Sequence, residues 1–441
     1  MMSAIRRSVR RLAHKAMASC AAFAAFLVLS GSASAATMNV IPLGDDVWLP
    51  TSGLAADASG NLYGTTYRGG NGNDGAVFEL IRGGDGSFTY KTLYAFCPVQ
   101  QHCNQAVPQS KLVVDVNGNL YGTTIAFHKG GGSVFELSPN ADRSVWTLTI
   151  PHRFCSFCTR DGTDPEAGLT YAGAASGALY DGVSPLYGTT TMGGQAHYGI
   201  VFSLVPSAGS WRESKLHEFV SPEGISPHAA VMIDGRGRIF GTTSLGGSQG
   251  DGTVFELTPG RKNSWDFSTI YSFCSAANCT DGRYPLSDLI EDAAGNLFGT
   301  TSIGGTCQAS GGCGVAFKLS RHKASWREDV LYNFCNLSNC ADGGDPAGGL
   351  VMDGEGNLFG ATIGGGNQTE SGGSAGVLYK LPAGGGEQVL YNFCSQVVVN
   401  NCIDGSNPTG DLLLDASGSL FGVTSSGGTS GNQGIAYELT P

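Results

Sequence analysis

The stretch Gly60-Asn61-Leu62-Tyr63-Gly64-Thr65-Thr66 decides the fold, because it returns at near-regular intervals along the chain. The third copy has lost the leading glycine, whereas the last threonine is present in every copy. Self-similarity at a fixed period is typical of repeat architectures, in which each copy forms one structural unit. Seven copies occur, at residues 60–66, 118–124, 185–190, 237–243, 295–301, 356–362 and 418–424.

Each copy belongs to a longer unit with four strand candidates. Six copies have an Asp three residues before the leading glycine, as Asp57 before Gly60, and a proline seven residues before that Asp. The Asp-x-x-Gly step is typical of a hairpin turn, in which the carboxylate accepts a backbone N–H and the glycine takes a positive φ. A double glycine follows the threonines, and two more short apolar stretches come next, such as Val77–Leu80 and Leu93–Phe96.

These units predict an all-β fold. Four antiparallel strands within about 58 residues, repeated seven times, predict a seven-bladed β-propeller, since propellers have four to eight such blades. A β-solenoid is the alternative, but its coils are shorter and its strands parallel. The last blade lacks a fourth strand, because the chain stops at Pro441 directly after a third one. We expect residues near 38–44 to complete that blade and to remove its free edge.

Residues 1–35 resemble a cleaved export signal. A short apolar run, Ala16–Leu29, follows a cationic start, and Ala33–Ala35 is a small-residue cleavage site. No other stretch approaches the ~18 apolar residues of a membrane span. We therefore expect an exported protein, periplasmic or extracellular, with a single propeller domain at 36–441. The cationic start comprises Arg6, Arg7, Arg10, Arg11 and Lys15, whose arginine pairs leave a twin-arginine signal as an alternative.

The charge of the chain excludes several partners. Residues 1–35 hold five basic and no acidic side chains, so their removal changes the net charge from −11 to −16. A protein this acidic repels nucleic acids and anionic lipid headgroups, and neither is an expected partner. We expect a monomer without a cofactor or a metal.

Twelve cysteines remain after residue 35, and they fall into six neighbouring pairs. An even number of cysteines in an exported protein predicts disulfides, and local pairing is the simplest connectivity. A redox pair or zinc ligands are the alternatives, but a redox motif would normally begin a helix, and none is indicated here. The pairs are Cys97/Cys103, Cys155/Cys158, Cys274/Cys279, Cys307/Cys313, Cys335/Cys340 and Cys394/Cys402.

The complete unit, Gly-Asn-Leu-Tyr-Gly-Thr-Thr, a double glycine and Val-Phe-Glu-Leu-x-Pro, resembles the GloVer (Gloeo_Verruco-type) tandem repeat of exported bacterial choice-of-anchor proteins. The resemblance extends over essentially the whole chain after residue 35. It implies export, a bacterial origin and a propeller-like fold, and it assigns no biochemical role. Some relatives end in a sorting anchor, whereas this chain has no apolar tail before Pro441.

Antiparallel blades place two sets of loops on the same side of the ring. The Gly-rich face, as we call it, carries the double-glycine loops and the cysteine loops with their Asp-Gly turns, and the hairpin face carries the Asp-x-x-Gly turns. Function is expected on the more elaborate Gly-rich face. Its candidate ligand-binding residues are the turn aspartates and two loop histidines, although Asp-Gly is also an ordinary turn composition. They are Asp161, Asp281, Asp342, Asp404, His128 and His197.

The last threonine of the repeat has two interpretations. A ring of hydroxyls could line the central channel, but a repeated hydroxyl more often bonds the backbone of the neighbouring blade, and we expect this structural role. The residues are Thr66, Thr124, Thr190, Thr243, Thr301, Thr362 and Thr424.

The sequence contains no catalytic constellation. The histidines lack metal-binding spacing, and no serine lies in a nucleophile elbow. We therefore expect a binding scaffold for a glycan or an envelope protein rather than an enzyme. A propeller-fold polysaccharide lyase or hydrolase and a structural envelope protein are the alternatives. An enzyme site would break the symmetry, and the places that do so are the insertion Ala172–Ser184, His128-Lys129, His197-Tyr198 and the Cys307/Cys313 loop.

Overall fold

The structure is a computed structural model. It describes residues 36–441 except 71, 98–105, 126–129, 156–160, 208, 308–312, 324, 347, 368–372, 400 and 430. Residues 1–35 are a separate unit outside the described residues, so the export signal stays a prediction. In the described part of the chain, no helix is long and apolar enough to cross a membrane.

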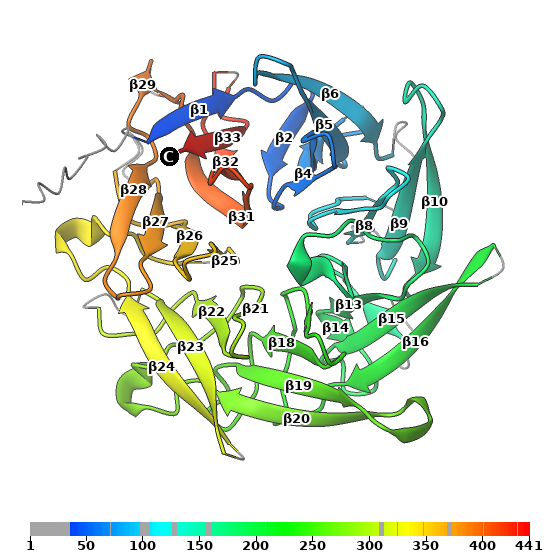
Figure 1. Cartoon of the computed structure of the whole chain (residues 1–441), viewed down its shortest axis with the longest axis vertical. Coiled ribbons are helices and arrows are strands. Elements are labelled where there is room, and N and C mark those ends of the chain that lie inside the picture. Colours follow the sequence, from blue (N-terminus) through cyan, green and yellow to red (C-terminus); the bar gives the residue numbers. More distant parts are fainter. Residues whose placement is uncertain are drawn as a thin grey trace, which may run out of the picture. The chain divides into compact units, whose positions relative to one another are not determined.

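Residues 36–441 form seven antiparallel blades arranged in a ring, which confirms the predicted seven-bladed propeller (Figure 1). Blade 1 contains β2 (Val47–Pro50), β3 (Ala55–Ala56), β4 (Leu62–Gly69), β5 (Ala76–Arg82) and β6 (Phe88–Ala95). Blade 2 contains β7 (Val113–Val114), β8 (Leu120–Thr124), β9 (Ser133–Pro139) and β10 (Trp146–Arg153). Blade 3 contains β12 (Thr170–Tyr171), β13 (Leu186–Thr190), β15 (Ile200–Ser207) and β16 (Ser210–Glu218).

The remaining blades repeat this order. Blade 4 contains β17 (Met232–Ile233), β18 (Ile239–Thr243), β19 (Thr253–Pro259) and β20 (Trp265–Ser272). Blade 5 contains β21 (Ile290–Glu291), β22 (Leu297–Thr301), β23 (Val315–His322) and β24 (Ser325–Asn333). Blade 6 contains β25 (Val351–Met352), β26 (Leu358–Thr362), β27 (Val377–Leu381) and β28 (Gln388–Asn392), and blade 7 contains β31 (Ser406–Leu414), β32 (Leu420–Ser426), β33 (Ile435–Thr440) and β1 (Thr37–Ile41).

Short elements lie in the loops between these strands. Two small ladders pair β11 (Gly162–Thr163) with β14 (Met192–Gly193) and β29 (Val397–Val398) with β30 (Asn401–Cys402). The short 3-10 helices are η1 (Ala174–Ser176), η2 (Arg261–Asn263), η3 (Ala277–Cys279) and η4 (Ser338–Cys340).

Strand β1 closes the ring, as the sequence predicted. It pairs antiparallel with β33, and Thr37 lies opposite Thr440 while Ile41 lies opposite Ala436. The strand begins one residue before the predicted segment and ends three residues earlier. The outer edge of β33 is therefore covered by the same chain, and blade 7 has four strands, as blades 2 to 6 do, whereas in blade 1 β2 and β3 both pair with β4.

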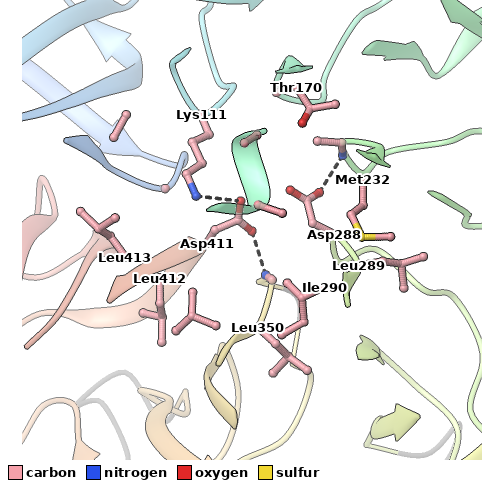
Figure 2. Close-up of a pocket in the computed structure, with 18 of the residues that line it drawn as sticks. Lys111, Thr170, Met232, Asp288, Leu289, Ile290, Leu350, Asp411, Leu412 and Leu413 are labelled. Carbon is pink, nitrogen blue, oxygen red and sulfur yellow. Dashed lines mark hydrogen bonds and ion pairs between the residues drawn. The ribbon is translucent and has the colours of Figure 1, made fainter. Parts of the chain in front are cut away.

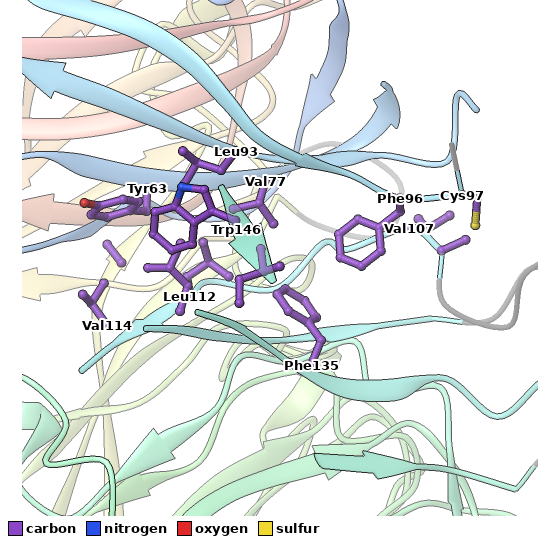
Figure 3. Close-up of a cluster of buried hydrophobic side chains, with 14 residues drawn as sticks. Tyr63, Val77, Leu93, Phe96, Cys97, Val107, Leu112, Val114, Phe135 and Trp146 are labelled. Carbon is purple, nitrogen blue, oxygen red and sulfur yellow. The ribbon is translucent and has the colours of Figure 1, made fainter. Parts of the chain in front are cut away.

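The apolar side chains of each blade pack between that blade and the next one. Between blades 1 and 2, Val77 and Phe96 of the first blade contact Phe135 and Trp146 of the second (Figure 3). Phe96 and Phe135 meet edge to face, with 5.3 Å between their ring centroids. Equivalent clusters occupy the other interfaces, so the core is a ring of interfaces rather than one central cluster.

A glycine just before the third strand makes a close contact with the next blade at all seven interfaces. Each of these glycines has a positive φ, and a Cβ added to it would overlap the proline ring of the neighbouring blade. Gly434 of blade 7 meets Pro50 of blade 1 in the same way, so the contact also closes the ring. The seven pairs are Gly75/Pro108, Gly132/Pro165, Gly199/Pro227, Gly252/Pro285, Gly314/Pro346, Gly376/Pro408 and Gly434/Pro50.

Four predicted disulfides are confirmed: Cys274–Cys279, Cys307–Cys313, Cys335–Cys340 and Cys394–Cys402. Cys97 and Cys155 are disulfide-bonded as well. Their predicted partners, Cys103 and Cys158, lie outside the described residues.

The glycine–proline contact predicts a position-specific cost for alanine. Gly314→Ala would add a Cβ that overlaps Thr301 O of its own blade and lies 2.6 Å from Pro346 Cδ, at a φ of +88°, so we expect the variant to lose more than about 2 kcal/mol of unfolding free energy. Gly386→Ala is the matched control, because its φ is +86° and no atom lies within 4 Å of the added Cβ. Chemical denaturation of both variants measures the difference, and equal losses would contradict the proposed packing.

Candidate functional site

The central channel contains a cavity to which every blade contributes. A cavity of about 1220 Å³ is lined by the inner segments of all seven blades. In each blade this segment follows the repeat proline, so equivalent positions of the seven copies meet around one axis. The fold therefore places the seven residues that share a repeat position in a ring around the axis. A functional site requires some of these equivalent residues to differ between blades.

The third residue after the repeat proline differs in charge between the copies. Four blades have glycine or alanine there, and the other three have charged side chains that lie together in the channel (Figure 2). In blade order the residues are Gly53, Lys111, Gly168, Ala230, Asp288, Gly349 and Asp411.

The three charged residues form one cluster. Lys111 Nζ lies 3.8 Å from Asp411 Oδ2, and the backbone N–H of Gly349 donates to Asp411 Oδ1 at 2.9 Å. The backbone N–H of Ala230 donates to Asp288 Oδ1 at 2.6 Å. Each carboxylate is thus held by a backbone amide of the preceding blade, which fixes its position in the channel.

Asp288 is the most perturbed acid of the cluster. It faces the channel and is partly accessible. Burial, followed by the negative charge of Asp411, raises the pKa of the Asp288 carboxyl well above its usual range, although Lys111 opposes this effect. Asp288 can therefore be a hydrogen-bond donor beside the acceptor Asp411.

Gly349 makes room for the two acids. A Cβ at this position would overlap Asp411 Oδ1 and would lie 3.6 Å from Asp288 Cβ. A side chain there would displace the Asp411 carboxylate from the amide that binds it. The cluster thus depends on a small residue in blade 6 as well as on the charged residues in blades 2, 5 and 7.

A second polar pair lies nearer to the Gly-rich face. Glu166 and His228 directly follow the repeat prolines of blades 3 and 4, and Glu166 Oε2 lies 2.7 Å from His228 Nδ1. Their side chains are 32% and 34% exposed, so a ligand in the channel can reach both. Neither Glu166 nor the charged cluster was among the candidate residues predicted from the sequence.

A sequence profile of the Gloeobacter/Verrucomicrobia repeat matches residues 176–437. The chain belongs to this repeat family. The match covers blades 4 to 7 and most of blade 3, and the motif count above extends the repeat to blades 1 and 2. Comparison with curated proteins found none that matches the chain.

Several solved structures resemble the repeat protein at low sequence identity, and the one with a TM-score above 0.5 has a similar fold. An ancestral GH74 enzyme has a TM-score of 0.54 at 10% identity, with 90% of this chain and 48% of the enzyme covered. The Trypanosoma rangeli sialidase has a TM-score of 0.46 at 10% identity, with 82% and 57% covered. The Penicillium chrysogenum alpha-L-arabinanase has a TM-score of 0.41 at 11% identity, with 92% and 98% covered. This chain thus spans about half the length of the first two, and the likeness concerns the fold alone.

The repeated threonines lie in the interior of the blades. All seven have no exposed surface, and none is among the residues that line the channel. Their hydroxyls bond within their own blade, as Thr243 does when it donates to Leu245 O at 2.9 Å. The hydrogen bond to the neighbouring blade comes instead from the first of the two consecutive threonines of the repeat. Thr242, for example, donates to Ser287 O at 3.3 Å. The expected contact between blades was therefore assigned to the wrong threonine.

The four candidate aspartates of the Gly-rich face bind their own loops. Asp281, Asp342 and Asp404 are buried, and each accepts a tyrosine O–H and a backbone N–H that follows a disulfide cysteine. Asp161 accepts the N–H of Cys155 at 3.0 Å. None of the four lines the channel, so the structure does not bring them together as a ligand site.

The two candidate histidines add nothing to the channel. His197 is exposed in a loop of blade 3 and does not line the cavity, and His128 lies outside the described residues. Where the structure describes the chain, the side-chain groups close enough to hold a metal are Cys307/Cys313/Cys335 and Asp251/Cys274/Cys279. All five of these cysteines form disulfides, so they offer no thiolate to a metal.

Two glutamates beside the loop aspartates titrate near neutral pH. Burial, followed by the charges of Asp281 and Asp329, raises the pKa of Glu328 to about 7. Burial and Asp342 raise the pKa of Glu387 to about 7 as well. Oε1 of each glutamate is buried without a hydrogen-bond partner, which is consistent with a protonated carboxyl.

We predict that the protein is more stable at pH 6 than at pH 8. The folded state keeps Glu328 and Glu387 protonated up to about pH 7, whereas the unfolded chain releases both protons near their ordinary pKa of 4.5. Their stabilising contribution is complete below 4.5 and is lost as the pH rises through 7. His217 acts in the opposite direction below pH 6.5, because burial lowers its pKa to about 4.

Thermal unfolding measures this dependence. We expect Tm to fall between about pH 6 and pH 8, and the double variant Glu328→Gln/Glu387→Gln to show a smaller fall because it has no proton to lose at these sites. Arg212→Gln, in which an exposed charge on β16 of blade 3 is removed, is the control. An equal fall in the double variant and in the unsubstituted protein would contradict the assignment.

Proposed function

We propose that this protein is an exported binding protein whose channel holds a neutral, hydroxyl-rich ligand such as a glycan. The observation that carries the proposal is the cluster Lys111, Asp288 and Asp411 at ring positions where four other blades need only glycine or alanine. The fold does not require these charges. Charged side chains inside a protein reduce stability unless they are paired, so their presence in one cavity favours a role in binding.

The chemistry of the cavity supports a neutral ligand. Lys111 and protonated Asp288 supply donors, whereas Asp411 and Glu166 supply acceptors, and sugars need both kinds of group. The turns at the hairpin end of the cavity add more carboxyl groups. Because the lining has more acidic than basic groups and the whole chain is acidic, an anionic ligand would be repelled.

The disulfides support a location outside the cytoplasm. Four are formed within the described residues, and such bonds persist in oxidising compartments. The ligand is therefore expected to be present in the periplasm or the medium.

Binding measurements with residues 36–441 test the proposal. We expect calorimetry with neutral oligosaccharides of glucose, xylose and arabinose to find at least one ligand, and Lys111→Ala and Asp411→Asn each to weaken its binding at least tenfold, which corresponds to about 1.4 kcal/mol. The amide introduced by Asp411→Asn retains an oxygen that can accept the Gly349 N–H, so the effect of this variant reports on charge. Arg327→Ala, which removes a side chain 72% exposed on blade 5, should leave the affinity unchanged. No binding to any of these sugars would refute the proposed glycan ligand.

Hydrolysis of the ligand is the second candidate, and the Asp288/Asp411 pair favours it. Acid and base catalysis requires neighbouring carboxyl groups with different pKa values, and the raised pKa of Asp288 beside Asp411 provides such a pair. Release of reducing ends from the bound sugar, abolished in Asp288→Asn, would establish this activity. Binding without release would leave the protein a binding scaffold.

A further inference from the structure

Blade 3 differs from the other six blades where its first two strands are joined. In the other blades a tight turn connects these strands, as Asp292 to Asn296 does in blade 5. In blade 3, residues 172–185 connect β12 with β13 and contain the 3-10 helix η1. The connection lies at the hairpin end of the channel, opposite the Gly-rich face.

The tip of this insertion reaches into the channel. Ala174, Ala175 and Ala178 line the same cavity as the turns of blades 5 and 6, which lie on the other side of the ring. In Figure 2 the short green helical turn lies between Lys111 and Asp288 in the view along the channel. Because it lines the cavity, the tip can limit how far a ligand enters, and its small, uncharged side chains offer few groups to bind one.

The base of the insertion is firmly attached to blade 2. Tyr180 has no exposed surface, its N–H donates to Val114 O at 3.0 Å, and its carbonyl accepts the N–H of Val116 at 2.9 Å. Its ring meets Tyr121 edge to face, with 5.4 Å between the centroids. Gly173 and Gly177, with φ of 103° and 72°, turn the chain at the two ends of η1. These contacts hold the tip in place over the channel.

We propose that the insertion is a stop that makes the channel accessible from the Gly-rich face only. The site then takes a short oligosaccharide or the end of a longer chain, and it excludes internal segments of a polymer, which would need an exit at the hairpin face. This inference rests on the proposed function, and it names the part of the ligand that is recognised. The charged cluster contacts the terminal residue of the bound chain.

The test compares chain ends with internal segments. The probes are cello- and malto-oligosaccharides of two to six units and soluble polymers of the same linkages. We expect the unsubstituted protein to bind the polymers in proportion to their concentration of chain ends. A variant in which a single glycine replaces Ala174–Ala178 keeps Tyr180. We expect its affinity for the polymers to rise at least tenfold when polymer concentration is expressed in sugar units.

A second pair of variants keeps the test independent of that deletion. Ala175→Trp enlarges the tip inside the cavity, and we expect it to weaken oligosaccharide binding at least tenfold without a change in Tm. Val183→Trp is the matched control, because Val183 belongs to the same insertion, is 70% exposed and does not line the cavity.

The outcomes separate the two proposals. Polymer binding by the unsubstituted protein in proportion to total sugar rather than chain ends would overturn the stop and leave the proposed function standing. Equal oligosaccharide affinity in Ala175→Trp and Val183→Trp would also overturn the stop without affecting the proposed function. Absence of binding to every sugar, in the variants as well, would refute both.

Discussion

The contact between a glycine of one blade and a proline of the next is the constraint on which this ring depends. It occurs at all seven interfaces, and each glycine combines a positive φ with a position that has no room for a Cβ. The proline ring fixes the start of the inner segment in the same place in every blade. The residues that follow the proline therefore meet around the axis, and the channel is a direct result of how the blades pack.

This dependence explains how much could be predicted from the sequence. The number of blades, the closing strand β1 and the described disulfides rest on spacing along the chain, which can be read without coordinates. The direction in which a hydroxyl points cannot, and so the contact between blades was assigned to Thr243 instead of Thr242. The last threonine is present in all seven copies, whereas the one before it is replaced by Ala361 and Val423 in two copies, so the pattern favoured the last threonine.

The charged cluster was missed for a different reason. Lys111, Asp288 and Asp411 each stand in an ordinary local sequence, and 300 residues separate the first from the last. Alignment of the seven copies on their prolines would have revealed them, since they replace glycine or alanine at one ring position. The turn aspartates attracted attention because they resemble ligand motifs, yet the structure uses them to bind loop amides. In a symmetric fold, the informative residue is the one that differs from its equivalents.

The pairing of β1 with β33 has a consequence for how the molecule is assembled. The hydrogen bond from Thr440 to Thr37 joins residues 403 positions apart, so this pairing must await synthesis of all seven blades. The entropy lost in joining two distant segments grows only with the logarithm of their separation, at about 0.6 kcal/mol per doubling. Late closure therefore reduces the free energy of unfolding only slightly, and its main effect is to delay completion of the ring. Since the two ends meet in one sheet, a circularly permuted gene that joins them and opens the chain at a loop between blades should encode the same ring.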